Sequence, residues 1–309
     1  MQGHKANIVS QALTYIEANL EEQLELDIVA DALHYSRFYL HRLFAEMAGI
    51  TLHEYVKRRR LTRAAEELVF SGKTVMEIAL ASGYGSRQAF TDAFRAIYKK
   101  APAAFRAEGK FYPLQLDVLS DALDGEPVKR GFGPDDIVHA VSSDAADWME
   151  LARLKIDGYP YFDELQYTEN LYRCMADGRA LILHDGCRAV GVLAFSAMNG
   201  RSGIKDVARE SSVQGSIDFL AVHPQYRSLG VEELFLSKLS ADIFPGGEIA
   251  VTTYRAGDKA DTGYREMYRR LGFQERELLV EFGYPTQRFV FSPEKIFLDR
   301  TRFFAEDFC

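Results

Sequence analysis

The sequence predicts a multidomain protein in which an all-α domain with two helix-turn-helix units precedes an α+β domain with a mixed sheet. The length of 309 residues is typical of two domains. Up to about residue 110, apolar residues recur at the spacing of amphipathic helices. From Asp135 onward, short apolar runs alternate with helical stretches, which indicates strands and helices in one layered domain.

Composition and charge exclude several classes of protein. No apolar run is long enough to span a membrane and the N-terminus lacks the apolar core of a signal peptide, so we expect a cytoplasmic protein without a membrane partner. The three cysteines are far apart and the seven histidines show no ligand spacing, so neither a disulfide scaffold nor a metal site is expected. Residues 1–110 carry 15 Lys and Arg against 13 Asp and Glu, whereas the remaining residues carry 22 against 32. This asymmetry favours a DNA-binding module joined to a module that does not bind DNA.

The first helix-turn-helix unit is expected to begin with a helix from Asn7 to Leu20. Asp27 is predicted to cap a short second helix, and His34 with Tyr35 forms the turn. Ser36 then caps the helix that would enter the major groove of DNA. The outward candidates for DNA contact on this helix are Arg37, Phe38, His41 and Arg42.

A long helix is expected to connect the two units. Thr51 and Glu54 have the spacing of a capping box, which opens a helix that runs to about Phe70. At 1.5 Å per residue its roughly 20 residues span about 30 Å, close to the ~34 Å of one turn of B-DNA. Two recognition helices on such a rod can enter successive major grooves. Within the run 57–60, one or two basic side chains are expected to contact phosphate, with Arg59 as the candidate, and the others to be solvated.

The second unit is predicted between Thr74 and Arg106. Thr74 and Glu77 form a further capping box, Gly83 supplies the positive φ of the turn, and Ser86 caps the second recognition helix. Arginine and glutamine side chains can pair with guanine and adenine edges in the major groove. The outward candidates on this helix are Arg87, Gln88 and Thr91.

Residues 5–108 resemble the DNA-binding domain of the AraC/XylS family of bacterial transcription regulators. The resemblance rests on Tyr35, Ser36, Arg37, Phe38, Leu40, Arg42 and Phe44 in the first unit, and on Ile78, Ala79, Gly83, Tyr84, Ser86, Phe90, Phe94, Pro102, Phe105 and Arg106 in the second. It implies sequence-specific binding to double-stranded promoter DNA, with base-reading roles for the outward candidates of both helices. Asp92 departs from the family pattern; its carboxylate could accept a hydrogen bond from a cytosine amino group or repel a phosphate.

Glycine and proline residues mark 111–134 as a linker, with room for a short helix at 114–123. The α+β domain is expected over 135–309, including a C-terminal extension. Its predicted elements are a strand at 137–141, helices at 145–156 and within 164–176, a hairpin of 180–184 and 188–195, a loop at 199–214, a strand at 216–222, a helix after Gly230, a strand at 248–253, a helix at 263–271, and strands at 274–283 and 286–292.

The stretch 217–239 carries a candidate anion site. A strand is followed by a loop with Arg227 and Gly230 and then by a helix, whose free N–H groups suit a pyrophosphate. Through this loop and the later run Tyr268, Leu271, Gly272 and Phe273, residues 135–292 resemble the GNAT family of acyl-CoA-dependent N-acetyltransferases. The resemblance implies binding of acetyl-CoA or CoA by Val222, Arg227, Ser228, Leu229, Gly230 and Val231. It also implies Tyr268 as the proton donor to the departing thiolate, and Asp218 is a candidate general base.

Two positions depart from the signature of that family. Ser228 stands where a glycine is frequent, and Glu232 stands where a small residue lets the backbone approach the pyrophosphate. Because a carboxylate repels phosphate, we expect a regulator whose GNAT-like domain senses a small ligand, an acyl-CoA or an amine. The alternative is an active N-acetyltransferase fused to a DNA-binding module. The sequence leaves homodimer formation open. Four tyrosines could line a pocket for a cationic ligand or fill the core: Tyr159, Tyr161, Tyr167 and Tyr172.

Overall fold

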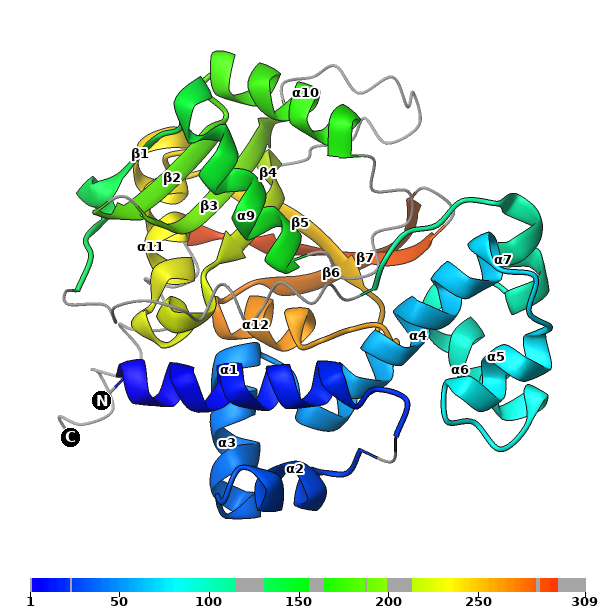
Figure 1. The fold of residues 1–309 in the computed structure, drawn as a ribbon. Coiled ribbons are helices and arrows are strands. Elements are labelled where there is room, and N and C mark those ends of the chain that lie inside the picture. The colour runs from blue at the N-terminus through cyan, green and yellow to red at the C-terminus, as the bar shows by residue number, and fades with distance from the viewer. Residues whose placement is uncertain are drawn as a thin grey trace, which may run out of the picture.

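The computed structural model describes residues 2–22, 24–114, 131–155, 164–186, 188–198, 213–281 and 284–293. A helical N-terminal domain precedes a C-terminal domain with a seven-stranded sheet (Figure 1). The predicted class, an all-α part followed by an α+β part with a mixed sheet, is therefore confirmed. Most of the helix expected at 114–123 and of the loop expected at 199–214 lies outside the described residues, as do Tyr159 and Tyr161.

The first helix-turn-helix unit consists of α1 (Gln2–Ala18), α2 (Leu26–Ala32) and α3 (Arg37–Ala48). Ser36 caps α3 as predicted, because its hydroxyl accepts a hydrogen bond from the backbone N–H of Tyr39 at 3.3 Å. The predicted cap of α2 is wrong. Glu25 is the N-cap residue, and Asp27 lies in the first turn, where a negative charge faces the positive end of the helix dipole.

The second unit consists of α5 (Val75–Ala81), α6 (Arg87–Tyr98) and α7 (Pro102–Glu108). The capping box at the start of α5 is confirmed: the Thr74 hydroxyl accepts from the N–H of Glu77 at 3.2 Å, and the Glu77 carboxylate accepts from the N–H of Thr74 at 2.6 Å. Ser86 caps α6 as predicted. The two turns are built alike, with Gly83 at φ +83° in one and His34 at φ +58° in the other.

The connecting helix is α4 (Leu52–Phe70), close to the predicted bounds. Only half of its predicted capping box forms: the Thr51 hydroxyl accepts from the N–H of Glu54, whereas the Glu54 carboxylate pairs with basic side chains one turn on. The first half of α4 packs in the core of the first unit and the second half packs in a separate core of the second unit. This single helix therefore carries both recognition helices.

The expectation of a phosphate-contacting basic run on α4 is wrong for its two central arginines. Arg58 is fully buried and Arg59 nearly so. Arg59 makes two short bonds to the carboxylate of Glu17 on α1, at 2.8 and 2.7 Å. Arg60 donates to the carbonyls of Leu20 and Glu22. Arg59 and Arg60 therefore hold α1 and the turn after it against α4, because their guanidinium groups bond to acceptors within the N-terminal domain.

The C-terminal domain begins with the 3₁₀ turn η1 (Pro134–Asp136) and contains one mixed sheet in the order β1-β2-β3-β4-β5-β7-β6. Among the described strands, only β4 and β5 pair in parallel. The strands are β1 (Ile137–His139), β2 (Ala180–Asp185), β3 (Arg188–Ala197), β4 (Val213–Val222), β5 (Glu248–Tyr254), β6 (Gln274–Glu281) and β7 (Tyr284–Phe291). The α-helices are α9 (Ala145–Lys155), α10 (Glu164–Ala176), α11 (Val231–Lys238) and α12 (Tyr264–Arg270).

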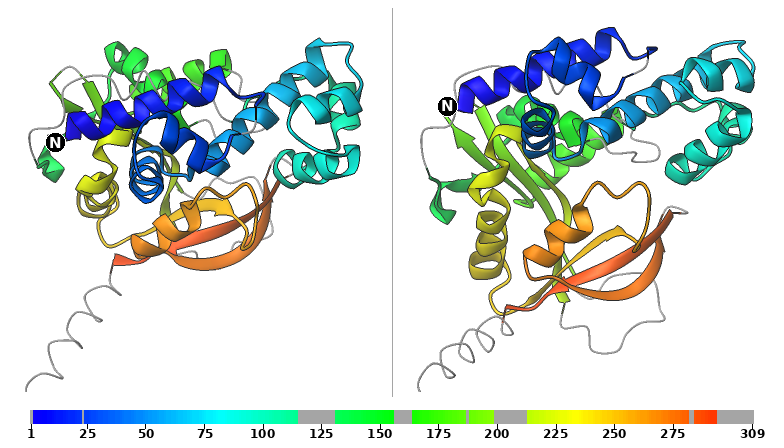
Figure 2. Two further views of the ribbon diagram at one scale, coloured as in Figure 1. Left: turned by 60° about the horizontal axis from the view of Figure 1, so that its bottom comes forward. Right: turned by 90° about the horizontal axis from the view of Figure 1, so that it is seen from below.

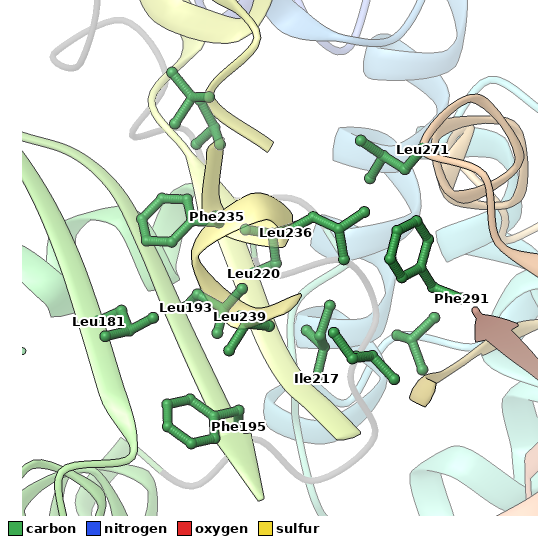
Figure 3. Close-up of a cluster of buried hydrophobic side chains, with 14 of the residues drawn as sticks. Leu181, Leu193, Phe195, Ile217, Leu220, Phe235, Leu236, Leu239, Leu271 and Phe291 are labelled. Atoms are coloured by element: carbon green, nitrogen blue, oxygen red, sulfur yellow. The ribbon is translucent and has the colours of Figure 1, made fainter. Parts of the chain in front are cut away.

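Helices cover both faces of the sheet, and each face has its own hydrophobic core. On one face, α11, the π turn η4 (Leu239–Ile243) and α12 pack on strand side chains. Figure 3 shows Phe235 and Leu236 of this layer lying against the sheet residues Leu193 and Leu220. On the other face, α9 and α10 surround Trp148. Among the described residues, no helix is long and apolar enough to cross a membrane.

Two features of β4 shape the centre of the sheet. Its parallel pairing with β5 ends at Ile217 and Val251, after which β4 runs on to Val222 paired with β3 alone. Opposite β3, the register shifts so that Asp218 is an extra residue, which forms a β-bulge. The two central strands therefore separate at their carboxyl ends, beside the loop that leads into α11.

The two domains pack against each other along α3 and α4. The 3₁₀ turn η3 (Pro224–Leu229) lies against α3, and the segment before α12 lies against α4 (Figure 2). Leu154 of α9 contacts the apolar cores of both domains. The C-terminal domain is therefore a docked partner of the helix-turn-helix units.

Candidate functional site

The predicted DNA-facing residues of the first unit all lie exposed on α3. Phe38 is 84% exposed, although a benzene ring is normally buried when a core is within reach. An apolar ring on a recognition helix can pack on the methyl group of thymine. Arg37 is held by Asp27 of α2, with 3.2 Å between Nε and Oδ1. The N-terminal half of α3 thus presents Arg37, Phe38, His41 and Arg42 on one free surface.

The second unit presents a similar surface at the start of α6. Arg87 and Gln88 are exposed, and Thr91 is half-buried. The Gln88 amide donates to the Asp92 carboxylate at 2.9 Å. Asp92, the position that departs from the family pattern, therefore orients a candidate base-reading side chain one turn before it.

The candidate anion loop consists of η3 and the first residues of α11. Gly230 joins them with φ +72°, a left-handed conformation that glycine adopts without strain. The side chains of Val222 and Val231 are buried in the sheet core, so they could meet a ligand only through their backbone. Leu229 is partly exposed, and Ser228 lies within η3 between it and Arg227.

Arg227, the expected partner of a pyrophosphate, has a protein partner in this structure. Its Nη1 donates to the backbone carbonyl of Met47, at the C-terminal end of α3, over 3.2 Å. Gly49 lies so close that a Cβ atom there would be 2.1 Å from the same nitrogen. The candidate ligand loop and a recognition helix are therefore in direct contact.

Glu232 follows the loop and is only 7% exposed. Its Oε2 accepts no hydrogen bond from any described residue. Burial raises the pKa of this carboxyl group, and the nearby charges of Lys155 and Arg270 oppose the shift only in part. A buried acid at the start of α11 can stay neutral or receive a cation, and in its charged form it repels an anion.

The two candidate catalytic residues lie in different surroundings. Tyr268 of α12 is buried against Phe273, and burial together with the charge of Glu232 raises its pKa, so its hydroxyl holds a proton at neutral pH. Asp218 is exposed in the bulge of β4 and accepts hydrogen bonds from the hydroxyls of Ser196 and Ser216. None of the described contacts joins Asp218 to Tyr268.

The two described tyrosines that were expected near a cationic ligand also lie in different surroundings. Tyr167 accepts a hydrogen bond from the Trp148 indole at 3.0 Å and packs on Phe219, so it belongs to the core. Tyr172 is exposed on α10. Within the described ranges, no group of three or more His, Cys, Asp or Glu side chains is placed to hold a metal ion.

Sequence reasoning missed the residues that join the two domains. Asp258 pairs with Lys99 at the end of α6 (2.6 Å), and the carbonyl of Ala260 accepts from Arg58 of α4 (2.5 Å). Both belong to the polar segment between β5 and α12, which resembles any surface loop. Their partners lie more than 150 residues away in sequence, so no local pattern signals them.

Comparison with known proteins supports the DNA-binding part. A family model described as a helix-turn-helix domain matches residues 29–108. The chain is 42% identical over 99 residues to the transposon Tn10 TetD protein of Escherichia coli, a match that covers 32% of this chain and 72% of TetD.

Two solved structures were also compared with the chain. A transcriptional regulator of Chromobacterium violaceum, described as having an AraC-type DNA-binding domain, is 32% identical, covers 33% of this chain and 92% of its own, and has a TM-score of 0.32. A GNAT-family acetyltransferase of Bacillus cereus is 14% identical, covers 50% of this chain and 95% of its own, and has a TM-score of 0.37. With most of TetD matched at 42% identity and both helix-turn-helix units present, the chain belongs to the AraC-type family of helix-turn-helix transcription regulators.

Proposed function

We propose that the C-terminal domain of this regulator senses a small ligand, an acyl-CoA or an amine, and thereby adjusts the affinity of the helix-turn-helix domain for promoter DNA. One observation carries the proposal: Arg227 of the candidate anion loop donates to the carbonyl of Met47 at the end of recognition helix α3. A ligand that engages the loop acts directly on a contact of that helix. Binding at one site is then coupled to binding at the other, as a ligand-controlled regulator requires.

An anionic ligand would act through Arg227. A phosphate group offers the guanidinium a charge-assisted, bidentate partner, which binds more strongly than a neutral carbonyl such as that of Met47. Such a ligand withdraws the side chain from α3. Because linkage is reciprocal, DNA that favours the docked form would also weaken binding of that ligand.

An amine would act through Glu232 instead. One carboxylate oxygen of this residue has no hydrogen-bond partner among the described residues, and its charge acts on the Tyr268 hydroxyl, so it provides a partner for an ammonium group. Tyr264 lies on α12, the same helix as Tyr268. The ammonium group of Lys155 on α9 lies 4.2 Å from the centroid of the Tyr264 ring, so this region already accommodates a cation. A cationic ligand would keep Glu232 ionised, since an opposite charge lowers the pKa of a carboxyl group.

The test starts with selection of bound duplexes from a random pool by the full-length chain. Affinity for the selected duplex is then measured by fluorescence anisotropy with and without CoA, acetyl-CoA and a panel of amines, and ligand binding is measured by calorimetry. We expect one ligand class to change affinity for the selected duplex at least about 5-fold, the low end of typical allosteric couplings. If no compound binds or changes affinity, the sensing proposal is wrong.

The place of Tyr268 on α12, where the GNAT resemblance implies a proton donor, supports a second candidate function, acetyl transfer from acetyl-CoA to an amine. A tyrosine hydroxyl is protonated at neutral pH and can give its proton to a departing thiolate, although the raised pKa of Tyr268 makes this hydroxyl a weaker acid. Turnover of acetyl-CoA that is lost in Tyr268→Phe and kept in Tyr264→Phe, on the same helix, would establish catalysis. Ligand binding without turnover would leave sensing as the function.

A further inference from the structure

Within the described part of the chain, hydrogen bonds or ion pairs at Arg227, Asp258 and Ala260 join the C-terminal domain to the helix-turn-helix domain, and the first two hold the ends of the recognition helices. Arg227 contacts the end of α3, and Asp258 contacts the end of α6. The third contact joins Ala260 to Arg58 in the middle of α4. The C-terminal domain therefore touches both recognition helices and the helix that carries them.

The contact with α3 matches the electrostatics of a helix end. The last carbonyls of a helix have no partner within it and carry partial negative charge, so a guanidinium group is a suitable donor to Met47. Gly49 is required here for two reasons. It ends α3 with φ +77°, and a side chain at this position would displace the tip of Arg227.

The contact with α6 is an ion pair whose carboxylate also accepts hydrogen bonds from other groups. Lys99 ends α6 in a left-handed conformation, and its ammonium group lies 2.6 Å from the Asp258 carboxylate, which is only 6% exposed. Asp258 also accepts hydrogen bonds from the Tyr284 hydroxyl at 3.2 Å and from the N–H of Ala260 at 2.9 Å. Breaking a shielded, multiply bonded pair of this kind costs more than breaking an exposed surface pair, because the remaining charge stays shielded from water without its partner.

The contact with α4 lies beside the ion pair. Arg58 is fully buried and bridges Glu54 on its own helix to the Ala260 carbonyl. Ala260 itself packs in the apolar core of the second helix-turn-helix unit. The short segment 258–260 therefore binds both α4 and α6.

We propose that the C-terminal domain is a clamp that holds α3 and α6 by their C-terminal ends and so fixes the relative orientation in which the two helices meet DNA. Bases are read by the N-terminal residues of a recognition helix, so a grip at the opposite ends leaves the reading surface free. The two units have separate cores joined through α4, so they could tilt against each other without the clamp. Fixing their orientation before binding removes an ordering cost from association with DNA.

The inference goes beyond ligand sensing, because the clamp operates when no ligand is present. It predicts that breaking either the contact of Arg227 with Met47 or the ion pair of Asp258 with Lys99 weakens binding to the selected duplex, which both units must contact at once. Binding to random duplex should change little, since it depends mainly on charge. Any ligand that draws Arg227 away from Met47 should lower affinity for the selected duplex in the same way.

The experiment compares two glycine variants of the full-length chain without ligand. Gly49→Ala displaces the tip of Arg227 and also strains a left-handed helix end. Gly109→Ala is the matched control, because Gly109 ends α7 at φ +63° with nothing within 4 Å of an added Cβ atom. We expect affinity for the selected duplex to fall at least about 5-fold in Gly49→Ala, with faster hydrogen exchange at 43–50, and to stay unchanged in Gly109→Ala.

A second pair of variants tests the contact with α6 by substitutions in the C-terminal domain. Asp258→Asn breaks the pair with Lys99, whereas Asp242→Asn breaks a pair with Lys238 inside the C-terminal domain, in which the Asp242 side chain is 55% exposed. We expect the same loss for Asp258→Asn and none for the control. The freed Lys99 charge could only strengthen binding to random duplex, so a loss cannot be due to charge.

The clamp would be supported if Gly49→Ala and Asp258→Asn both lower affinity for the selected duplex but not for random duplex, and if their controls lower neither. Either variant keeping its affinity for the selected duplex within about 2-fold, while hydrogen exchange shows its contact broken, would overturn it. Unchanged exchange at both contacts in both variants would overturn it equally, because the contacts would then not hold the helices. Sensing has a separate readout. Loss in the variants without any effect of CoA or amines would leave the clamp standing and refute the sensing proposal.

Discussion

The ion pair between Arg59 and Glu17 gives a prediction that separates a structural role from a role in DNA binding. Arg59 makes two bonds to the Glu17 carboxylate, which also accepts from the Tyr55 hydroxyl at 3.0 Å. Removing one partner of a buried pair costs about 3–5 kcal/mol. The Glu17 side chain keeps 22% of its exposure and retains the bond from Tyr55, so we expect Arg59→Ala to lower the free energy of unfolding by about 2–3 kcal/mol.

Urea unfolding of the full-length chain measures this loss when two signals are followed. Far-ultraviolet circular dichroism reports largely on the helices, and the fluorescence of Trp148, the single tryptophan, reports on the C-terminal domain. We expect the first transition to shift more than the second. Arg63→Ala is the control on the same helix, because Arg63 is half exposed and 3.9 Å from Glu21; it should cost at most about 0.5 kcal/mol.

The salt dependence of DNA binding completes the test. A phosphate contact adds about one unit to the slope of log affinity against log salt concentration. If Arg59 serves only α1 and α4, the slope for Arg59→Ala equals that of the wild-type chain under conditions where both are folded. A slope reduced by about one, with a stability loss below about 1 kcal/mol, would refute the structural role.

Three further predictions concern other sites. Gln88→Ala should lower discrimination at one base pair of the selected duplex by about 1–3 kcal/mol, and Arg276→Ala on β6 should not, as competition binding with single-base variants will show. Because burial raises the pKa of Glu232, the folded state keeps this proton after the unfolded state has lost it, and stability falls as pH rises through that window. Glu232→Gln should therefore raise Tm over the wild type by more at pH 8 than at pH 4.5, and an equal difference at both would contradict a raised pKa. His34→Gly should raise the free energy of unfolding by about 1 kcal/mol, because it removes a side chain held at φ +58°; a loss in urea unfolding would show that the histidine makes a compensating contact.

Features fixed by neighbours in sequence were predictable. Ser36, Ser86 and the Thr74–Glu77 box cap their helices as predicted, because each bonds to a backbone group three residues away. The cap of α2 was not predictable by residue preference, since Glu25 holds the position without a side-chain bond. Helical periodicity also placed both helix-turn-helix units and the mixed-sheet domain in their correct order.

Features fixed by distant partners were not predictable. The basic run 57–60 has the appearance of solvated surface, because nothing near it in sequence reveals the bond of Arg59 to Glu17 or of Arg58 to Ala260. The same holds for Arg227, whose partner Met47 lies 180 residues away. The exposed positions on α3 and α6 follow from helical geometry, whereas the role of the candidate ligand loop depends on how the two domains pack.

The shared helix α4 also limits how the chain can change in length. One residue inserted into this helix would turn the second unit by about 100° and advance it by about 1.5 Å. A base pair of B-DNA turns by only about 34–36°, so the insertion would misphase α6 by roughly three base pairs. It would also pull Arg58 and Lys99 from their partners in the other domain. The length of α4 is therefore constrained both by the DNA that the two units meet and by the domain packed against it.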